Sequence, residues 1–147
     1  TGKLLCPGLV VLAPDPWKYR SVHLALRTVL SDYTDRVLPK SIDEFVLDLE
    51  GSPVLSDLRN MFEIAGEIKT RIKKEVGEWL TVSIGISTNR FLAKTASGLH
   101  KPDGLDEINK NNFRQIYSKL ALVDLCGIKL RNASRLTAHG IYTVVDF

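Results

Sequence analysis

Two amphipathic helical patterns, each opened by a capping residue and a proline, constrain the fold of this chain most strongly. The first follows Asp15-Pro16 and the second follows Ser52-Pro53. An Asp or Ser N-cap with proline at the first helical position is a typical helix start. Apolar residues then recur at helical spacing in both segments, which predicts amphipathic helices. The predicted helices span residues 16–31 and 53–76.

Short runs of β-favouring residues separate and follow these helices. The expected strands span residues 9–12, 36–42, 45–49 and 81–86, and a third helix runs from a cap at Ser87 or Thr88 to about Gly98. The resulting order is strand, helix, strand, strand, helix, strand. This is the split βαβ arrangement, so the sequence predicts an α+β, ferredoxin-like domain with helices packed on one sheet.

The pattern changes after Lys101-Pro-Asp-Gly104, where helical spacing begins. This spacing places Phe113, Ile116 and Tyr117 on one face of a helix. We therefore expect a first domain over residues 1–104 and a smaller helical domain over residues 105–147.

Composition narrows the setting of the chain and the class of its partners. No apolar run approaches the roughly 20 residues that span a membrane. Cys6 and Cys126 form neither a metal-binding motif nor a disulfide framework, which favours a reducing, cytoplasmic location. From residue 88 onward there are 9 Lys and Arg against 5 Asp and Glu. This excess favours a polyanion as partner, and an ordinary solvated surface is the alternative.

An acid pair, Asp43 and Glu44, interrupts the apolar run KSIDEFVLDL at residues 40–49. Within a regular strand the two side chains would face opposite ways, but at a bend between two strands both carboxylates reach one point. Two such like charges repel unless a divalent cation neutralises them. Carboxylate oxygens favour Mg²⁺, with Mn²⁺ as the alternative ion. A plain polar turn is the other interpretation, and Asp48, in phase with Glu44, is expected at the surface.

Residues 83–105, SIGISTNRFLAKTASGLHKPDGL, resemble a segment of the Y-family, or translesion, DNA polymerases. They match the family motif S-[IVL]-G-I-x2-N-[KR]-x-L-A-K-x-A-S and the K-P-x-G motif that follows it. Ser41-Ile-Asp-Glu44 also matches the family's metal-binding turn, S-[IL]-D-E. Three motifs in the family's order make the resemblance specific, and it extends from Cys6 to Asp146. The chain is therefore expected to be a polymerase palm with part of a thumb.

This resemblance implies template-directed transfer of a nucleotide from a deoxynucleoside triphosphate to the 3′ end of a DNA primer, in translesion synthesis and DNA repair. Asp43 and Glu44 would be two of three carboxylates that hold two Mg²⁺ ions in the complete enzyme. One ion would help the primer hydroxyl attack, and the other would hold the triphosphate and stabilise the pyrophosphate. Lys101, in the K-P-x-G segment, would contact the incoming triphosphate.

Contacts with primer–template DNA are expected from two regions. Asn89, Arg90 and Lys94 lie in the first turns of a helix, where backbone N–H groups and basic side chains favour phosphates. A structural bridge between helix and sheet is an equal alternative for Lys94. Residues 122–146 resemble the family's helix-hairpin-helix.

The hairpin turn departs from the family pattern. The family presents a G-I-G turn to a DNA phosphate, whereas this chain has Gly127-Ile-Lys129. A lysine resists the positive φ that glycine permits, so we expect a reshaped turn. Gly127, Lys129 and Arg131 are the expected DNA contacts here, and Gly140 is expected to end the following helix.

Several parts of the family pattern have no counterpart in this sequence. The family's third carboxylate lies on an N-terminal strand, and its little-finger domain follows the thumb. We therefore expect this chain alone to be inactive, and a processivity clamp to bind through other regions. One alternative is a non-catalytic DNA- or partner-binding module derived from a polymerase. Another is a GGDEF-type nucleotide cyclase, but the Gly-Gly-Asp/Glu-Glu-Phe signature is absent.

Overall fold

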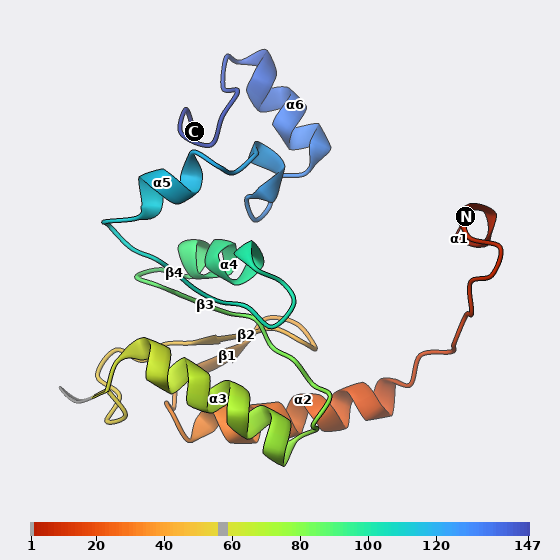
Figure 1. Cartoon of the computed structure of the whole chain (residues 1–147), viewed down its shortest axis with the longest axis vertical. Helices are drawn as coiled ribbons and strands as arrows, with labels where there is room; N and C mark the ends of the chain where they lie inside the picture. The colour runs from red at the N-terminus through yellow and green to blue at the C-terminus, as the bar shows by residue number, and fades with distance from the viewer. Residues whose placement is uncertain (1, 56–58) are drawn as a thin grey trace.

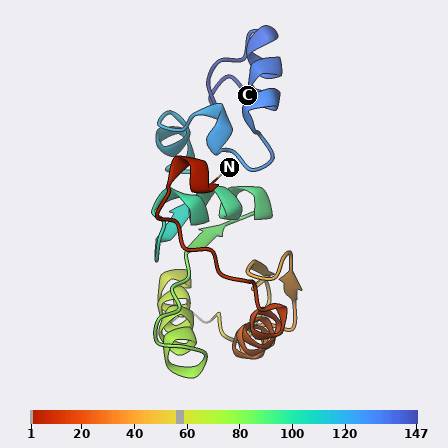
Figure 2. The ribbon, with the colours of Figure 1, turned by 90° about the vertical axis from the view of Figure 1, so that its right-hand side faces the viewer.

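The computed structural model describes residues 2–55 and 59–147. Two long helices lie side by side against the strands, and a third helix packs on the strands from the other side (Figure 1). Figure 2, turned by 90° about the vertical axis, shows the two long helices at the bottom, the third helix above them and the C-terminal part at the top. The described elements are α1 (Gly2–Leu5), α2 (Pro16–Ser31), β1 (Val37–Pro39), β2 (Phe45–Leu47), α3 (Met61–Glu75), β3 (Ile84–Ser87), α4 (Arg90–Leu99), β4 (Leu105–Ile108), α5 (Phe113–Tyr117), the 3-10 turn η1 (Leu122–Asp124) and α6 (Leu130–Ala138). This mixture of helices and short strands confirms the predicted α+β class. Within the described ranges, no helix combines the length and apolar character needed to cross a membrane.

The first predicted helix is confirmed, and its start follows the expected chemistry. Asp15 is the N-cap of α2, and its side chain accepts a hydrogen bond from the Lys18 N–H at 3.2 Å. Pro16 occupies the first helical position, where its missing N–H costs nothing.

The second predicted helix starts later than expected. The N-cap of α3 is Asn60, which forms a capping box with Glu63: each side chain accepts from the other's backbone N–H. Ser52 was expected to be the cap, but it is buried and its hydroxyl donates to the Tyr33 carbonyl at 2.5 Å. The prediction of a helix from residue 53 is therefore wrong for residues 53–55, and residues 56–58 lie outside the described ranges.

The third predicted helix has a different cap from the two that were proposed. Asn89 caps α4, and its side chain accepts from the Leu92 N–H at 2.9 Å. Ser87 is still part of β3, and its hydroxyl donates to the Ile108 carbonyl at 2.5 Å. The predicted end near Gly98 agrees with the last residue of α4, Leu99.

The strands form two separate two-stranded sheets in the described ranges. β1 pairs with β2 in antiparallel register, and β3 pairs with β4 in parallel register. The predicted single sheet is therefore not formed by the described strands. The helical pattern expected directly after Gly104 is wrong for residues 105–108, which form β4. The first helix beyond this strand is α5.

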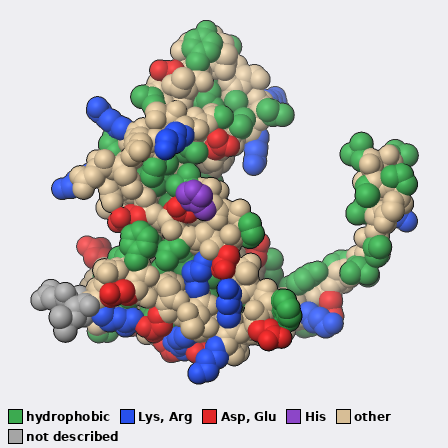
Figure 3. Space-filling view, in the orientation of Figure 1, with side chains coloured by type: hydrophobic (Ala, Val, Ile, Leu, Met, Phe, Trp, Pro, Cys, Tyr) green, Lys and Arg blue, Asp and Glu red, His purple; other side chains and the backbone are tan. Residues whose placement is uncertain are grey.

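The predicted strand at residues 9–12 is not formed either. This segment lies in an extended N-terminal arm, where Val10 is 78% exposed and Leu12 is 83% exposed. Figure 3 shows apolar side chains along the arm. The residues favour β-structure, but a strand needs a hydrogen-bonding neighbour, and no described strand pairs with this segment.

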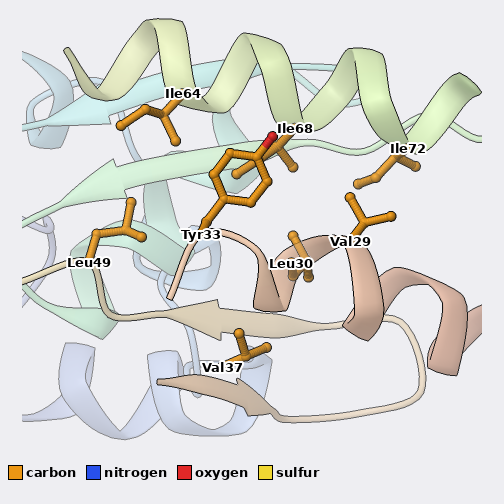
Figure 4. Close-up of a cluster of buried hydrophobic side chains, with 8 residues drawn as sticks. All are labelled: Val29, Leu30, Tyr33, Val37, Leu49, Ile64, Ile68 and Ile72. Atoms are coloured by element: carbon orange, nitrogen blue, oxygen red, sulfur yellow. The ribbon is translucent and has the colours of Figure 1, made fainter. Parts of the chain in front are cut away.

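One hydrophobic core joins α2 and α3 to the first hairpin (Figure 4). Ile64, Ile68 and Ile72 recur every four residues along one face of α3 and are at most 5% exposed. They meet Leu30 of α2 and Leu49, which follows β2. This core fixes the base of the β1–β2 hairpin, which carries the acid pair.

Helix α4 packs closely on β3 and β4, where Ala96 and Ile108 are completely buried. Gly85 of β3 makes this approach possible, because a Cβ at that position would lie 2.0 Å from the Ala93 carbonyl oxygen. The contact between strand and helix is thus direct backbone packing.

The C-terminal part has a small core of its own, formed by Leu122, Leu125, Ile128 and Val144. Helix α6 ends as predicted at Gly140, which has φ +83°. The Gly140 N–H donates to Thr137 O and the Ile141 N–H to Leu136 O, which is the Schellman pattern. The proposed boundary after residue 104 stays a prediction, and the pairing of β4 with β3 extends the first sheet system to Ile108.

Candidate functional site

The acid pair lies in the tight turn that connects β1 and β2. The Lys40 and Ser41 N–H groups both donate to the Glu44 carbonyl, at 2.8 and 3.3 Å, and close the turn. The Ser41 hydroxyl donates to Asp43 Oδ1 at 2.6 Å. This hydrogen bond is the main cause that lowers the pKa of the Asp43 carboxyl, and the charges of Lys94 and Lys101 lower it further. Asp43 is therefore held as a carboxylate.

Glu44 is paired with a lysine of α4, a helix that is distant in the sequence. Its Oε2 accepts a charge-assisted hydrogen bond from Lys94 Nζ on α4, and both side chains are about one-third exposed. This contact joins residues 50 positions apart in the sequence. The bridge between helix and sheet that the sequence left open for Lys94 is thus present.

A cavity of about 530 Å³ separates the two sheets and is lined by β2 on one side and β3 on the other. Its charged lining consists of Asp43, Glu44, Arg90, Lys94, Lys101 and Asp103. In the described ranges β2 pairs only with β1, and β3 only with β4, so each turns one unpaired edge to this space. The cavity combines free backbone edges with a cluster of unlike charges.

Lys101 reaches this cavity from the loop between α4 and β4. The loop is closed tightly, because a Cβ at Gly104 would lie 2.3 Å from the His100 carbonyl oxygen. The Gly104 N–H donates to the Ser83 hydroxyl at 3.2 Å, and its carbonyl accepts from the Ile84 N–H at 3.0 Å. Lys101 itself is exposed. Its ammonium group is therefore available to a ligand in the cavity.

The acid pair supplies hard oxygen donors of the kind that Mg²⁺ prefers, both on the same cavity. Residues 2–55 and 59–147 contain no group of three His, Cys, Asp or Glu side chains arranged for a metal ion. Asp48 does not join the pair: its carboxylate meets Arg36 Nη1 at 3.2 Å and accepts from the Glu50 N–H. The donor set fits half of a carboxylate metal site.

The three residues at the start of α4 have different roles in the structure. The side chain of Asn89 is used as the helix cap, so its carbonyl oxygen is occupied by the Leu92 N–H. Arg90 is exposed and lines the cavity. Arg90 and Lys94 thus lie on one face of α4, toward the acid pair.

Gly127, Lys129 and Arg131 do not line this cavity: Gly127 and Lys129 lie in the turn before α6, and Arg131 lies in its first turn. Gly127 has φ +84°, whereas Lys129 has φ −108° as the N-cap of α6. Lys129 therefore does not adopt a positive φ, and in this turn the positive φ falls on Gly127. Gly127, Lys129 and Arg131 are exposed, as a phosphate contact requires.

Sequence reasoning missed one residue of this region, Lys69 of α3. Its ammonium group contacts the loop that carries Lys101, and its side chain is only 16% exposed. A signal was available: Lys69 follows Ala65 by four residues and precedes Ile72 by three, so it lies within the apolar stripe of the helix. A lysine there must find partners for its charge.

Comparison with known proteins gives consistent matches. The model of the impB/mucB/samB family matches residues 2–98. DNA polymerase IV 1 of Bacillus subtilis is 39% identical over 139 residues, which cover 95% of this chain and 32% of that protein. DNA polymerase IV of Pseudomonas aeruginosa is 37% identical over 146 residues, which cover 99% of this chain and 41% of that protein. The chain thus spans about a third to two-fifths of the length of these relatives.

Solved structures agree with these matches. DinB from Sulfolobus solfataricus superposes with a TM-score of 0.82 at 27% identity, over 96% of this chain and 40% of that one. An insertion ternary complex of Dbh DNA polymerase gives the same TM-score and identity over the same shares of the two chains. The arrangement of helices and strands described above is therefore that of these polymerases.

Proposed function

Because the chain belongs to the impB/mucB/samB family, we propose that it forms the palm and part of the thumb of a Y-family DNA polymerase. The reaction would be template-directed transfer of a nucleotide from a deoxynucleoside triphosphate to a DNA primer, in translesion synthesis in the cytoplasm. The observation that carries this proposal is the convergence of Asp43, Glu44 and Lys101 on one cavity from two separate segments.

Each of these side chains would have a distinct role. Asp43 is kept ionised by Ser41 and by nearby lysines, so it can hold a divalent cation at neutral pH. Glu44 is held toward the cavity by Lys94. Two Mg²⁺ ions, or Mn²⁺, would supply activation of the primer hydroxyl and charge neutralisation of the triphosphate. Lys101 would bind the triphosphate as a compact point charge.

The half-site also indicates what the complete site requires. A third carboxylate would come from a further strand, and the cavity between β2 and β3 offers that strand two free edges. The 147-residue chain alone is then inactive, because its acid pair lacks this partner. Primer–template DNA would lie over Arg90 and the turn at Gly127–Lys129, and contact with a processivity clamp would lie outside this chain.

The test is primer extension by a polymerase that contains this segment. Asp43→Asn and Glu44→Gln should each reduce nucleotide transfer at least 1,000-fold by removing a metal ligand, while Asp48→Asn should leave it unchanged. Asp48 is the matched control because the same chemical change falls on a carboxylate already paired with Arg36. Circular dichroism and urea unfolding would establish that all three variants fold alike.

A second measurement separates the enzyme from a non-catalytic module. Mg²⁺ titration of the 147-residue chain, followed by NMR, should shift the amides of Asp43 and Glu44, and more strongly when a deoxynucleoside triphosphate is present. Full activity of the Asp43→Asn polymerase would contradict the proposed chemistry. Binding of primer–template without nucleotide transfer, by a polymerase in which Asp43 and Glu44 are intact, would favour the binding module instead.

A further inference from the structure

The loop that carries Lys101 is held by one partly buried lysine of α3, Lys69. Lys69 Nζ donates to the Asp103 carbonyl at 2.5 Å, the Val82 carbonyl at 3.1 Å and the Gly104 carbonyl at 3.2 Å. It also lies 2.8 Å from Asp103 Oδ1. A lysine has three N–H donors, so these four oxygens use its full capacity. Lys69 thus joins α3, the entry to β3 and the loop.

Asp103, which Lys69 contacts through both its carbonyl and its carboxylate, has an unusual backbone conformation. Its φ is +59°, in the left-handed region that non-glycine residues rarely adopt. Its carboxylate is shared between Lys69 and Lys73, whose Nζ lies 3.1 Å from Oδ2. These two lysines also lower the pKa of the Asp103 carboxyl. The ion pairs compensate for the strained turn and fix where it bends.

The bend sets the position of Lys101, two residues earlier in the chain. Lys101, Pro102 and Asp103 all line the cavity that contains the acid pair. Since Lys69 is occupied by three backbone carbonyls and one carboxylate, it has no donor left for a ligand. Its function in this region is to hold the loop.

We propose that Lys69 is the positioning residue that places the Lys101 ammonium group for triphosphate binding. This inference rests on the proposed function of Lys101. A methionine at residue 69 keeps the length and apolar stem of lysine but loses all four contacts to oxygen. The loop should then move, and Lys101 should lose its defined place relative to Asp43 and Glu44.

The first test uses the 147-residue chain and needs no ligand. Lys69→Met should increase hydrogen exchange of the Gly104 amide, which donates to Ser83, by 10-fold or more. Lys74→Met is the matched control, because Lys74 is exposed on the same helix. Asp103→Asn weakens the clamp from the loop side and should give an intermediate increase. Unchanged Gly104 exchange in a folded Lys69→Met chain would overturn the inference.

The second test measures nucleotide use in a polymerase that contains this segment. Lys69→Met should raise the KM for the deoxynucleoside triphosphate about 10-fold, with a much smaller change in kcat and in the Kd for primer–template. The Lys69→Met/Lys101→Ala double variant should be no worse than Lys101→Ala alone, because both changes remove the same interaction. Lys74→Met should resemble the unchanged enzyme.

The outcomes distinguish the two proposals. If Lys101→Ala raises the KM but Lys69→Met does not, Lys69 has no positioning function and the proposed polymerase site stands. If neither change affects the KM, the proposed triphosphate site itself fails, and the positioning role fails with it. Additive losses in the double variant would overturn the positioning role, because Lys69 would then act independently of Lys101.

Discussion

The close approach of α4 to β3 can be tested by adding one methyl group. In Gly85→Ala the new Cβ would lie 2.0 Å from the Ala93 carbonyl oxygen and 2.3 Å from the Ser97 nitrogen. Ordinary contacts begin at 3.4 Å, so the helix would have to move away from the strand by about 1.4 Å. Both obstructing atoms are backbone atoms, so no side-chain rotation can relieve the clash.

This displacement should be costly because the helix covers a fully buried region. Ala96 and Ile108 are 0% exposed between α4 and the strands. Overpacking of such sites costs about 1–3 kcal/mol, and the rigid backbone neighbours place Gly85→Ala near 3 kcal/mol. For a chain of this size that corresponds to a fall in Tm of roughly 6–12 °C.

Gly66→Ala adds the same methyl group at a position where no atom obstructs it, so the opposite effect on stability is expected. Gly66 lies inside α3, and a Cβ there has nothing within 4 Å. Alanine should stabilise the helix by roughly 0.5–1 kcal/mol, since glycine loses more backbone entropy on folding. Urea unfolding followed by circular dichroism would measure both changes. Equal stability of Gly85→Ala and the unchanged chain would refute the packing argument.

Three further predictions concern the core, the loop and the C-terminal turn. Ile64→Ala should cost about 2–5 kcal/mol by urea unfolding, because Ile64 is 1% exposed, whereas Phe62→Ala at a 44% exposed position should cost less. The Asp103 pKa lies below its ordinary 3.8, so its contribution to stability is complete above that pH and is lost as the pH falls through the lowered folded value. Acid unfolding of Asp103→Asn should therefore show less stability loss over this range than the unchanged chain. Gly140→Ala should cost about 1 kcal/mol in a thermal melt, because alanine must adopt φ +83° there.

Local sequence signals predicted the helices and the acid turn because their causes are local. Asp15 marks the start of α2 by a hydrogen bond to the N–H three residues later, and the adjacent Pro16 marks it by its fixed φ. The cap residue was predicted wrongly for α3 and α4, where several nearby residues could act as caps. Ser52 and Ser87 also carry hydroxyls that could cap a helix, but these hydroxyls donate to the carbonyls of Tyr33 and Ile108 instead.

Strand pairing and the positioning of the loop were not predictable in the same way. Residues 9–12 have the composition of a strand, yet a strand forms only beside another edge, which composition does not reveal. Residues 105–108 form a strand because β3 lies beside them, although the pattern around them is helical. The contacts of Lys69 join residues 13 to 35 positions apart, beyond any local motif.

Unpaired strand edges and an excess of positive charge occur at the same place, and this agreement supports one explanation for both. In the part of the chain that the structure describes, β2 and β3 each turn an unpaired edge to the cavity. The charges are also unbalanced there, with Arg90, Lys94 and Lys101 facing Asp43, Glu44 and Asp103, whose carboxylate is already paired with Lys69 and Lys73. Lys94 occupies Glu44, so a divalent cation must compete with an ammonium group for the acid pair. One additional strand that carries a carboxylate would pair both edges and add the negative charge that favours the cation over Lys94.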